Sequence, residues 1–140
     1  MIYLWIAIGS ALGGVSRYAL TKALMPTSVA FPWSTIVINV IGSFIIGFFG
    51  TLTLSGSRYA VPESARLFVM VGICGGFTTF SSFSLQTLDL LRSGYWGRAA
   101  ANILLSVLLC LAAVGIGHAL ASKMNGGTQI AQTYEEESAS

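Results

Sequence analysis

Four long apolar stretches divide the chain and constrain its fold more than any other feature of the sequence. They run over about Ile2 to Leu24, Thr35 to Leu54, Arg66 to Leu91 and Trp96 to Leu120. A helix that crosses a bilayer needs roughly 20 mainly apolar residues, and each stretch is long enough. Only 9% of the residues are charged, whereas about a quarter are charged in a typical soluble domain. The sequence therefore predicts an all-α integral membrane protein with four transmembrane helices.

The chain divides into a transmembrane domain over residues 1–123 and an aqueous tail over residues 124–140. The tail sequence NGGTQIAQTYEEESAS has few apolar side chains to bury and includes Glu135, Glu136 and Glu137. Such a composition is typical of a disordered segment. The opening residues MIYLWIAIG lack the basic residues and the cleavage site of a signal peptide, so we expect them to begin the first span.

Lysines and arginines are spread almost evenly over the two sides that four spans would create. The side with the N-terminus, the second connection and the C-terminus has Arg58, Arg66 and Lys123. The other side has Lys22, Arg92 and Arg98, together with Arg17 if its side chain reaches the surface. An excess of these residues on one side normally sets the orientation, and no such excess exists here. A small protein could be oriented by other means, but the pattern favours insertion in both orientations and pairing as an antiparallel, dual-topology homodimer.

Two glycines of the first span, Gly9 and Gly13, lie four residues apart and therefore on one face of the helix. Small residues at this spacing let neighbouring transmembrane helices approach closely. We expect the first span to pack against another helix through this face. The second span has a weaker signal of the same kind at Gly42.

The third apolar stretch is interrupted by GGFTTFSSFS, residues 75–84. The pair Gly75–Gly76 lowers helix propensity, and we expect a break at mid-membrane between one half-helix over 66–75 and another over 81–91. Backbone that is not helical is tolerated at that depth only where protein buries it or where it lines a cavity. A simple kink, filled by hydroxyl groups that bond back to the helix, is the alternative. Five hydroxyl side chains within residues 78–84 exceed what a kink needs and favour a functional break.

The second span contains a buried amide, Asn39, with Thr35 one turn before it. An amide is costly in hydrocarbon unless it has partners, which makes Asn39 a candidate functional residue. Polar residues also connect transmembrane helices without any further role. Position alone does not distinguish the two interpretations.

Polar residues recur at every fourth position of the last span and therefore share one face of the helix. They are Arg98, Asn102, Ser106 and Cys110. A packing stripe would explain the serine and the cysteine. It explains the arginine and the asparagine less well. A row of neutral hydrogen-bond donors that begins at a cation is typical of a path for anions.

Phe80 and Phe83 flank the serines of the third stretch and face the same way. Phenylalanines on a membrane helix usually pack in the core or face lipid. The edge of an aromatic ring carries positive partial charge. Ring edges turned toward a path would therefore attract a small anion without holding it tightly, as conduction requires.

The spans lack the groups that other membrane functions need. Glu63 and Asp89 lie near span ends, so a proton-coupled multidrug exporter would have no central carboxylate for exchange. His118 is the only histidine, and Cys74 and Cys110 have no metal-ligand spacing. We therefore expect no enzyme activity and no organic cofactor, and the absence of a basic run indicates no nucleic-acid partner. A small dual-topology exporter remains the main alternative function, and a scaffold that transports nothing is the second.

Three motifs together resemble the Fluc (CrcB-type) fluoride channels of microbes. They are GGVSRY over residues 13–18, TIVINVIGS over residues 35–43 and GGFTTFSSFS over residues 75–84. The resemblance covers all four spans, and the third motif is its most specific part. It implies a passive channel that exports cytoplasmic fluoride and relieves fluoride toxicity, in the inner membrane of a bacterium. The channel would be an antiparallel homodimer with two pores in the lipid bilayer.

The resemblance also implies roles for particular residues. Backbone carbonyls of Gly75 and Thr78 would hold a structural sodium ion at the dimer centre. The fluoride path would include the following side chains: Thr35, Asn39, Thr79, Phe80, Ser81, Ser82, Phe83, Asn102, Ser106 and Cys110. Arg17 and Arg98 would be vestibule or structural cations.

The chain departs from the family pattern at several positions. Ser34 stands where a glycine is common, and Gln86 stands where a glutamate is common. Along the fourth span, Asn102 replaces a frequent tyrosine and Cys110 a frequent serine. These differences put in doubt any role for a carboxylate at position 86 and affect the expected conduction rate, but they leave the third motif intact.

Overall fold

The computed structural model describes residues 1–126 and Ser138, and these residues form helices and connections without any strand. The predicted all-α class is therefore confirmed for this part of the chain, whereas residues 127–137 of the predicted acidic tail, with Glu135 to Glu137, lie outside the described residues. The tail was predicted to begin at residue 124, but the last helix continues to Met124, and Asn125 is buried and donates to the carbonyl of Thr51 at 3.2 Å. The long helices are α1 (Ile2–Leu24), α2 (Trp33–Leu52) and α6 (Trp96–Met124). A short 3-10 helix, η1 (Met25–Thr27), follows α1.

The third apolar stretch is built from four consecutive helical segments. They are α3 (Glu63–Leu67), the π-helical η2 (Phe68–Cys74), α4 (Gly75–Phe77) and α5 (Phe80–Arg92). Among the described residues, three segments are long and apolar enough to cross a membrane: Trp33–Leu52, Glu63–Arg92 and Trp96–Met124. The helix α1 has its predicted bounds and 23 residues, but it is not one of these three. Its crossing of the membrane stays a prediction.

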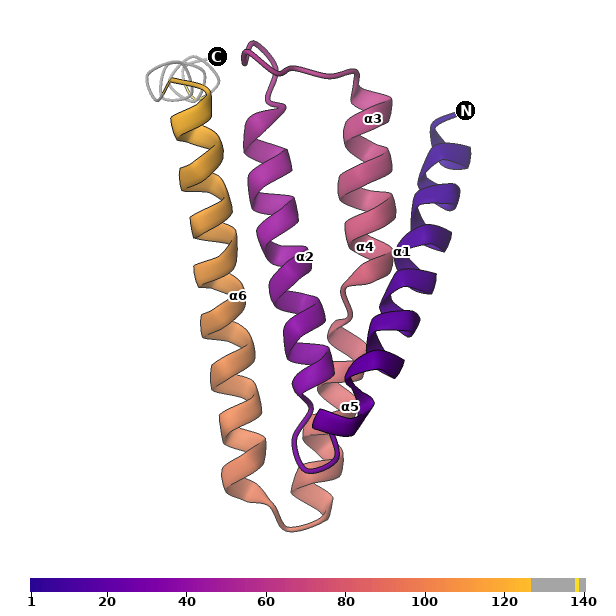
Figure 1. Cartoon of the computed structure of the whole chain (residues 1–140), viewed down its shortest axis with the longest axis vertical. Coiled ribbons are helices and arrows are strands. Elements are labelled where there is room, and N and C mark those ends of the chain that lie inside the picture. Colours follow the sequence, from indigo (N-terminus) through magenta and orange to yellow (C-terminus); the bar gives the residue numbers. More distant parts are fainter. Residues whose placement is uncertain (127–137, 139–140) are drawn as a thin grey trace.

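The helices run up and down in turn (Figure 1). The N-terminus, the α2–α3 connection and the end of α6 lie at one end, and η1 and the α5–α6 turn lie at the other. The helix α2 packs along α6, while α1 packs mainly on η2 and α4. The lysines and arginines are consequently divided between the two ends as the sequence predicts.

Glycines bring α1 close to the third stretch, as the spacing of Gly9 and Gly13 predicts. A Cβ atom at Gly9 would lie 2.6 Å from the carbonyl oxygen of Phe68, and one at Gly13 would overlap the carbonyl oxygen of Ile73. On the facing side, a Cβ at Gly76 would lie 2.5 Å from the carbonyl oxygen of Ser10. These backbones are in direct contact, which is the packing that small residues permit between membrane helices.

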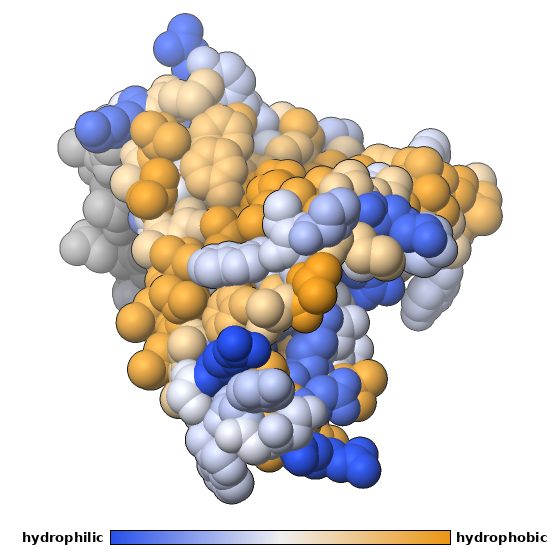
Figure 2. All heavy atoms as spheres, turned by 60° about the horizontal axis from the view of Figure 1, so that its bottom comes forward, coloured by the Kyte–Doolittle hydropathy of each residue, from blue (hydrophilic) through white to orange (hydrophobic). Residues whose placement is uncertain are grey.

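The outer surface of the helices is largely apolar. Leu104, Leu108 and Leu111 of α6 are 60%, 62% and 63% exposed. Figure 2 turns the α5–α6 end toward the viewer and shows hydrophilic residues gathered at this end, with hydrophobic residues along the flanks. This distribution fits helices that lie in lipid with their ends in water.

The break in the third stretch lies at Thr78–Thr79, inside the gap between the predicted half-helices over 66–75 and 81–91, and it does not include Gly75–Gly76. Thr78 has φ −78° and ψ 159°, Thr79 has φ −153° and ψ 110°, and Gly75–Phe77 is helical. Gly76 is in the helix because its missing side chain lets α4 contact α1. Low helix propensity is overridden here by tertiary packing.

Candidate functional site

Asn39 of α2 holds the extended backbone at the break. Its Oδ1 accepts a hydrogen bond from the amide of Thr79 at 2.8 Å, and its Nδ2 donates to the carbonyl of Thr79 at 3.1 Å. One side-chain amide thus satisfies both backbone polar groups of a residue that has left the helix. This explains how the break is stable away from water.

The hydroxyl of Thr79 starts α5. Its Oγ1 accepts a hydrogen bond from the amide of Ser82 at 3.1 Å, which is the N-cap interaction that a threonine provides. The same hydroxyl donates to the hydroxyl of Ser82 at 3.0 Å and lies 3.2 Å from that of Ser81. The hydroxyl-rich sequence therefore serves first to build the break.

The break also removes the helical partners of two carbonyl groups. In a continuous helix the amide of Thr79 would bond the carbonyl of Gly75, and the amide of Ser82 would bond that of Thr78. Both amides bond side chains instead. The carbonyl of Thr78 accepts a long hydrogen bond of 3.4 Å from Nη1 of Arg17.

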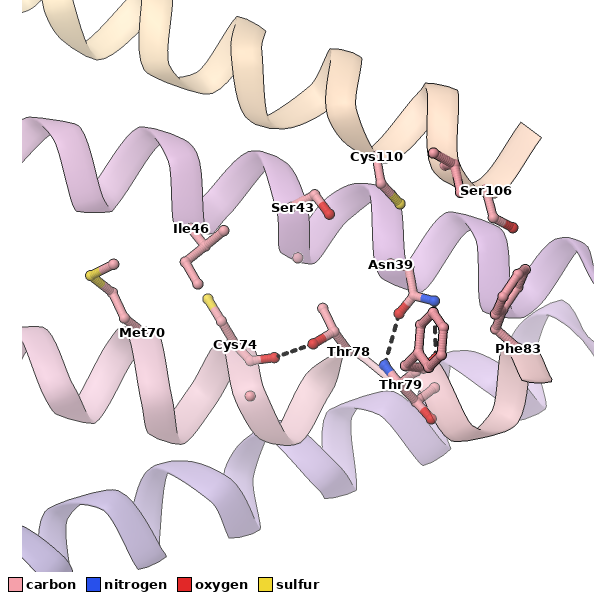
Figure 3. A pocket seen from close by; sticks show the side chains of 14 residues that line it. Asn39, Ser43, Ile46, Met70, Cys74, Thr78, Thr79, Phe83, Ser106 and Cys110 are labelled. Atoms are coloured by element: carbon pink, nitrogen blue, oxygen red, sulfur yellow. Dashed lines mark hydrogen bonds between the residues drawn. The ribbon is translucent and has the colours of Figure 1, made fainter. Parts of the chain in front are cut away.

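A cavity of about 340 Å³ lies beside the break, between α2, the third stretch and α6. We call it the central cavity (Figure 3). Its lining residues are Asn39, Gly42, Ser43, Ile46, Met70, Cys74, Gly75, Thr78, Thr79, Phe80, Phe83, Ser106, Val107 and Cys110. None of them is charged. The cavity therefore presents neutral hydroxyl, amide, thiol and aromatic groups.

Paired phenylalanines border the central cavity on α5. The ring centroids of Phe80 and Phe83 are 5.3 Å apart and the ring planes are inclined by 46°. Phe80 is 78% exposed, whereas Phe83 is half-buried. The wall of the cavity at Phe80 is thus open to the outside of this single chain.

The central cavity unites eight of the predicted site residues and leaves out six. Those inside are Asn39, Gly75, Thr78, Thr79, Phe80, Phe83, Ser106 and Cys110. Arg17, Thr35 and Ser82 line a separate cavity, and Arg98 lines another. Ser81 is exposed at the start of α5 and lines none of these three cavities.

Asn102 is the sixth residue outside the central cavity. It is 1% exposed and donates to the hydroxyl of Thr87 on α5 at 2.9 Å. The hydroxyl of Ser106 donates to Oδ1 of Asn102 at 3.3 Å. Asn102 therefore connects α6 to α5 and orients Ser106. Its predicted role on the anion path stays a prediction.

Several residues of the central cavity were not among the predicted site residues. Ser43 follows Asn39 by four residues, so extending that helix face by one turn would have found it. Met70 and Cys74 have the same spacing on the third stretch, but nothing in their chemistry distinguishes them from packing residues. Figure 3 shows the side chains of Ser106 and Cys110 coming from α6 toward those of α2 and the third stretch.

Replacing Asn39 by leucine is expected to lower the free energy of unfolding by about 2 kcal/mol, because the amide and carbonyl of Thr79 lose their partners away from water. Equilibrium unfolding in detergent would measure the loss. Ser43→Ala is the matched control, since it changes another polar residue of α2 that lines the same cavity. Equal stability of the two variants would contradict the role of Asn39 at the break.

Comparison with known proteins adds an independent finding. Residues 4–118 match the model of the family described as CrcB-like protein, Camphor Resistance (CrcB). A fluoride-specific ion channel FluC of Gluconobacter oxydans (strain 621H) is 57% identical over 136 residues, covering 96% of this chain and 94% of that protein. The FluC of Methylocella silvestris is 60% identical over 126 residues, covering 89% of this chain and 96% of its own. The FluC of Rhodospirillum rubrum is 50% identical over 128 residues, covering 91% of this chain and 99% of that protein.

Proposed function

The chain belongs to the CrcB-like family, and on this basis we propose that it is a passive, fluoride-selective channel that lets fluoride leave the bacterial cytoplasm. Relatives of high identity are named fluoride-specific ion channels. The proposal includes two pores in an antiparallel dimer and a sodium ion at the dimer centre. It also includes a location in the inner membrane, with α1 as a fourth span.

The uncharged lining of the central cavity is the observation that carries the proposal. Fluoride is small and strongly hydrated, so a path must replace its water with several donors placed close together. Each donor must also bind weakly enough to release the ion. The hydroxyl groups of Thr78, Thr79 and Ser106 line the cavity. They donate to Cys74, Ser82 and Asn102 in this structure and would have to rotate to donate to a passing ion. A buried arginine would trap the ion. Among its lining residues the cavity has no carboxylate, which an exporter that exchanges protons for cations would need.

A second, antiparallel copy is the natural partner at the open wall of the cavity. Phe80 is an exposed aromatic residue at the rim, and burying it against protein would stabilise a dimer through apolar contact. The even division of lysines and arginines supports insertion in both orientations. In such a dimer the phenylalanines of one copy would complete the path of the other.

The residues at the break fit a structural sodium ion. A hard cation prefers oxygen ligands, and backbone carbonyls are the oxygens that bind alkali ions in channels. The carbonyls of Gly75 and Thr78 have lost their helical amides, and Gly75 lies at the surface where a second copy could approach. Sodium would share the carbonyl of Thr78 with Arg17.

Exchanging sodium for N-methylglucamine, which is too large for such a site, is expected to lower the melting temperature of the dimer by several degrees. An ion that binds only the folded dimer stabilises it by about 3 kcal/mol when present at about 100 times its Kd. Thermal unfolding of the purified protein in the two chloride salts at equal ionic strength measures the shift. Identical melting curves would remove sodium from the proposal.

Growth of a bacterium that lacks its own fluoride channel tests the proposed function in cells. Expression of this chain should restore growth on fluoride and leave sensitivity to organic cations such as ethidium unchanged. Resistance to ethidium without resistance to fluoride would support the exporter instead. An empty vector is the control for both media.

A further inference from the structure

The hydroxyl groups that line the central cavity differ in whether they already have a hydrogen-bond acceptor. Those of Thr78, Thr79 and Ser106 each donate to a protein oxygen, at 2.8, 3.0 and 3.3 Å respectively. Such a group can donate to a passing ion only after its bond within the protein has broken. The remaining hydroxyl group of the lining belongs to Ser43 of α2.

The hydroxyl of Ser43 makes no hydrogen bond with any residue in the described part of the chain. Hydroxyl groups on membrane helices can bond back to the carbonyl four residues earlier, and Thr21, Thr53 and Thr87 do so here at 2.7 to 2.8 Å. Ser43 is half-buried, and its hydroxyl oxygen is not among the buried polar atoms that lack a partner. A ligand the size of a water molecule can therefore reach this hydroxyl.

Gly42 determines where Ser43 lies relative to the break. A Cβ atom at Gly42 would overlap Cγ2 of Thr78, so the glycine lets α2 contact the non-helical segment at this level. In Figure 3 the hydroxyl of Ser43 points toward the end of the central cavity where Asn39 lies and away from Met70. The cavity thus has a polar end, which includes Ser43, and an apolar end at Met70.

Folding of the single chain does not explain a serine at position 43. Its hydroxyl contributes no hydrogen bond to the protein within residues 1–126. A polar group in a membrane helix is costly unless it has a partner, and alanine would occupy the same helix position without that cost. We therefore expect the partner to come from the cavity itself, as a water or an ion.

We infer that Ser43 contacts the anion in the central cavity and is the hydroxyl that first replaces a water of its hydration shell. The O–H group of Ser43 can donate without breaking a bond within the protein, whereas the other three hydroxyl groups must rotate first. Cys110 lines the same cavity from α6, but a thiol is only a weak donor. The inference rests on the proposed function, which supplies the identity of the anion.

Substitutions of Ser43 separate the hydroxyl from the size of the side chain. Ser43→Thr keeps the hydroxyl, and Ser43→Val has nearly the shape of threonine with a methyl group in place of the hydroxyl. Ser43→Ala removes the hydroxyl and adds no bulk. Each variant is reconstituted in liposomes, and a fluoride-selective electrode measures the initial rate of efflux. Ser16→Ala is the matched control, because Ser16 is an exposed serine of α1 that does not line the central cavity.

Ser43→Ala and Ser43→Val should each slow fluoride efflux about tenfold, because the ion loses one hydrogen bond from a neutral donor to a charged acceptor. Ser43→Thr and Ser16→Ala should stay within about twofold of the unsubstituted protein, since both keep that donor. Equilibrium unfolding in detergent should show that Ser43→Ala is as stable as the unsubstituted protein. A residue with only a structural role would not combine slower efflux with unchanged stability.

Efflux from Ser43→Ala at the rate of the unsubstituted protein would overturn the inference while the proposed function stands. Equal rates from Ser43→Thr and Ser43→Val would also overturn it, because the hydroxyl would then make no difference. If Ser43→Val does not purify as a monodisperse protein, Ser43→Ala against Ser43→Thr gives the same comparison. Release of no fluoride by the unsubstituted protein would overturn the proposed function and the inference together.

Discussion

Phe80→Ile is expected to abolish fluoride efflux, with a decrease on the order of 100-fold or more, while the protein still assembles as a dimer. Isoleucine keeps the apolar character of the side chain but has no aromatic edge to present to an anion. Phe80 is 78% exposed in the single chain, so its replacement removes little packing within the protomer. Ion-selective electrodes would measure efflux from liposomes, and size-exclusion chromatography would measure the dimer.

Leu88→Ile on the same helix provides the control, because Leu88 is also exposed, at 48%, but does not line the central cavity. This variant should retain full efflux. Unchanged efflux in Phe80→Ile would remove Phe80 from the ion path. Loss of the dimer in Phe80→Ile would instead assign Phe80 a structural role at the interface.

Gly13→Ala is expected to lower the free energy of unfolding by about 3 kcal/mol, at the upper end of the cost of overpacking. The added methyl group would overlap the carbonyl oxygen of Ile73 and lie 2.8 Å from the amide nitrogen of Phe77. Both contacts are with backbone, which cannot rotate away as a side chain can. The helix α1 would therefore have to move off η2 and α4, and Gly75 and Thr78 would move with them.

The neighbouring glycine supplies the matched control. A Cβ at Gly14 would meet no atom within 4 Å, so Gly14→Ala should be neutral or should stabilise the helix by roughly 0.5 to 1 kcal/mol. Chemical unfolding of both variants in detergent measures the difference. Similar stabilities would contradict the close contact between α1 and the third stretch.

Element type and bounds were predictable because long apolar runs leave few choices in a membrane. The helix α1 has the predicted ends, and α2 and α6 differ from prediction by a few residues. The close packing of α1 was also readable from the spacing of its glycines. Hydropathy and small-residue spacing are local signals, and they describe features that a single helix determines.

The break was predictable to within a few residues, but its position at Thr78–Thr79 could not be derived from local signals. Gly75–Gly76 has low helix propensity but remains helical, since α4 must approach the backbone of α1. Thr79 leaves the helix because Asn39, forty residues earlier in the chain, binds its amide and carbonyl. A propensity scale contains no information about such a distant partner.

The division of the polar residues between separate cavities is a second feature that needed the structure. Thr35 and Asn39 are one turn apart on α2, yet Thr35 lines the cavity between α1, α2 and α5 and Asn39 lines the central cavity. Asn102 shares a helix face with Ser106, but its side-chain amide is hydrogen-bonded to the hydroxyl of Thr87 on α5. Which neighbour a polar residue meets depends on helix packing, and the sequence pattern gives only its face.

Efflux of fluoride and chloride from liposomes that contain the purified protein is the most direct test of the central claim. A potassium ionophore is added so that potassium can leave with the anion and no membrane potential stops the efflux. Ion-selective electrodes then measure the two anions. We expect rapid loss of fluoride and no loss of chloride above that from protein-free liposomes. Retention of fluoride, or equal loss of both anions, would contradict a fluoride-selective channel.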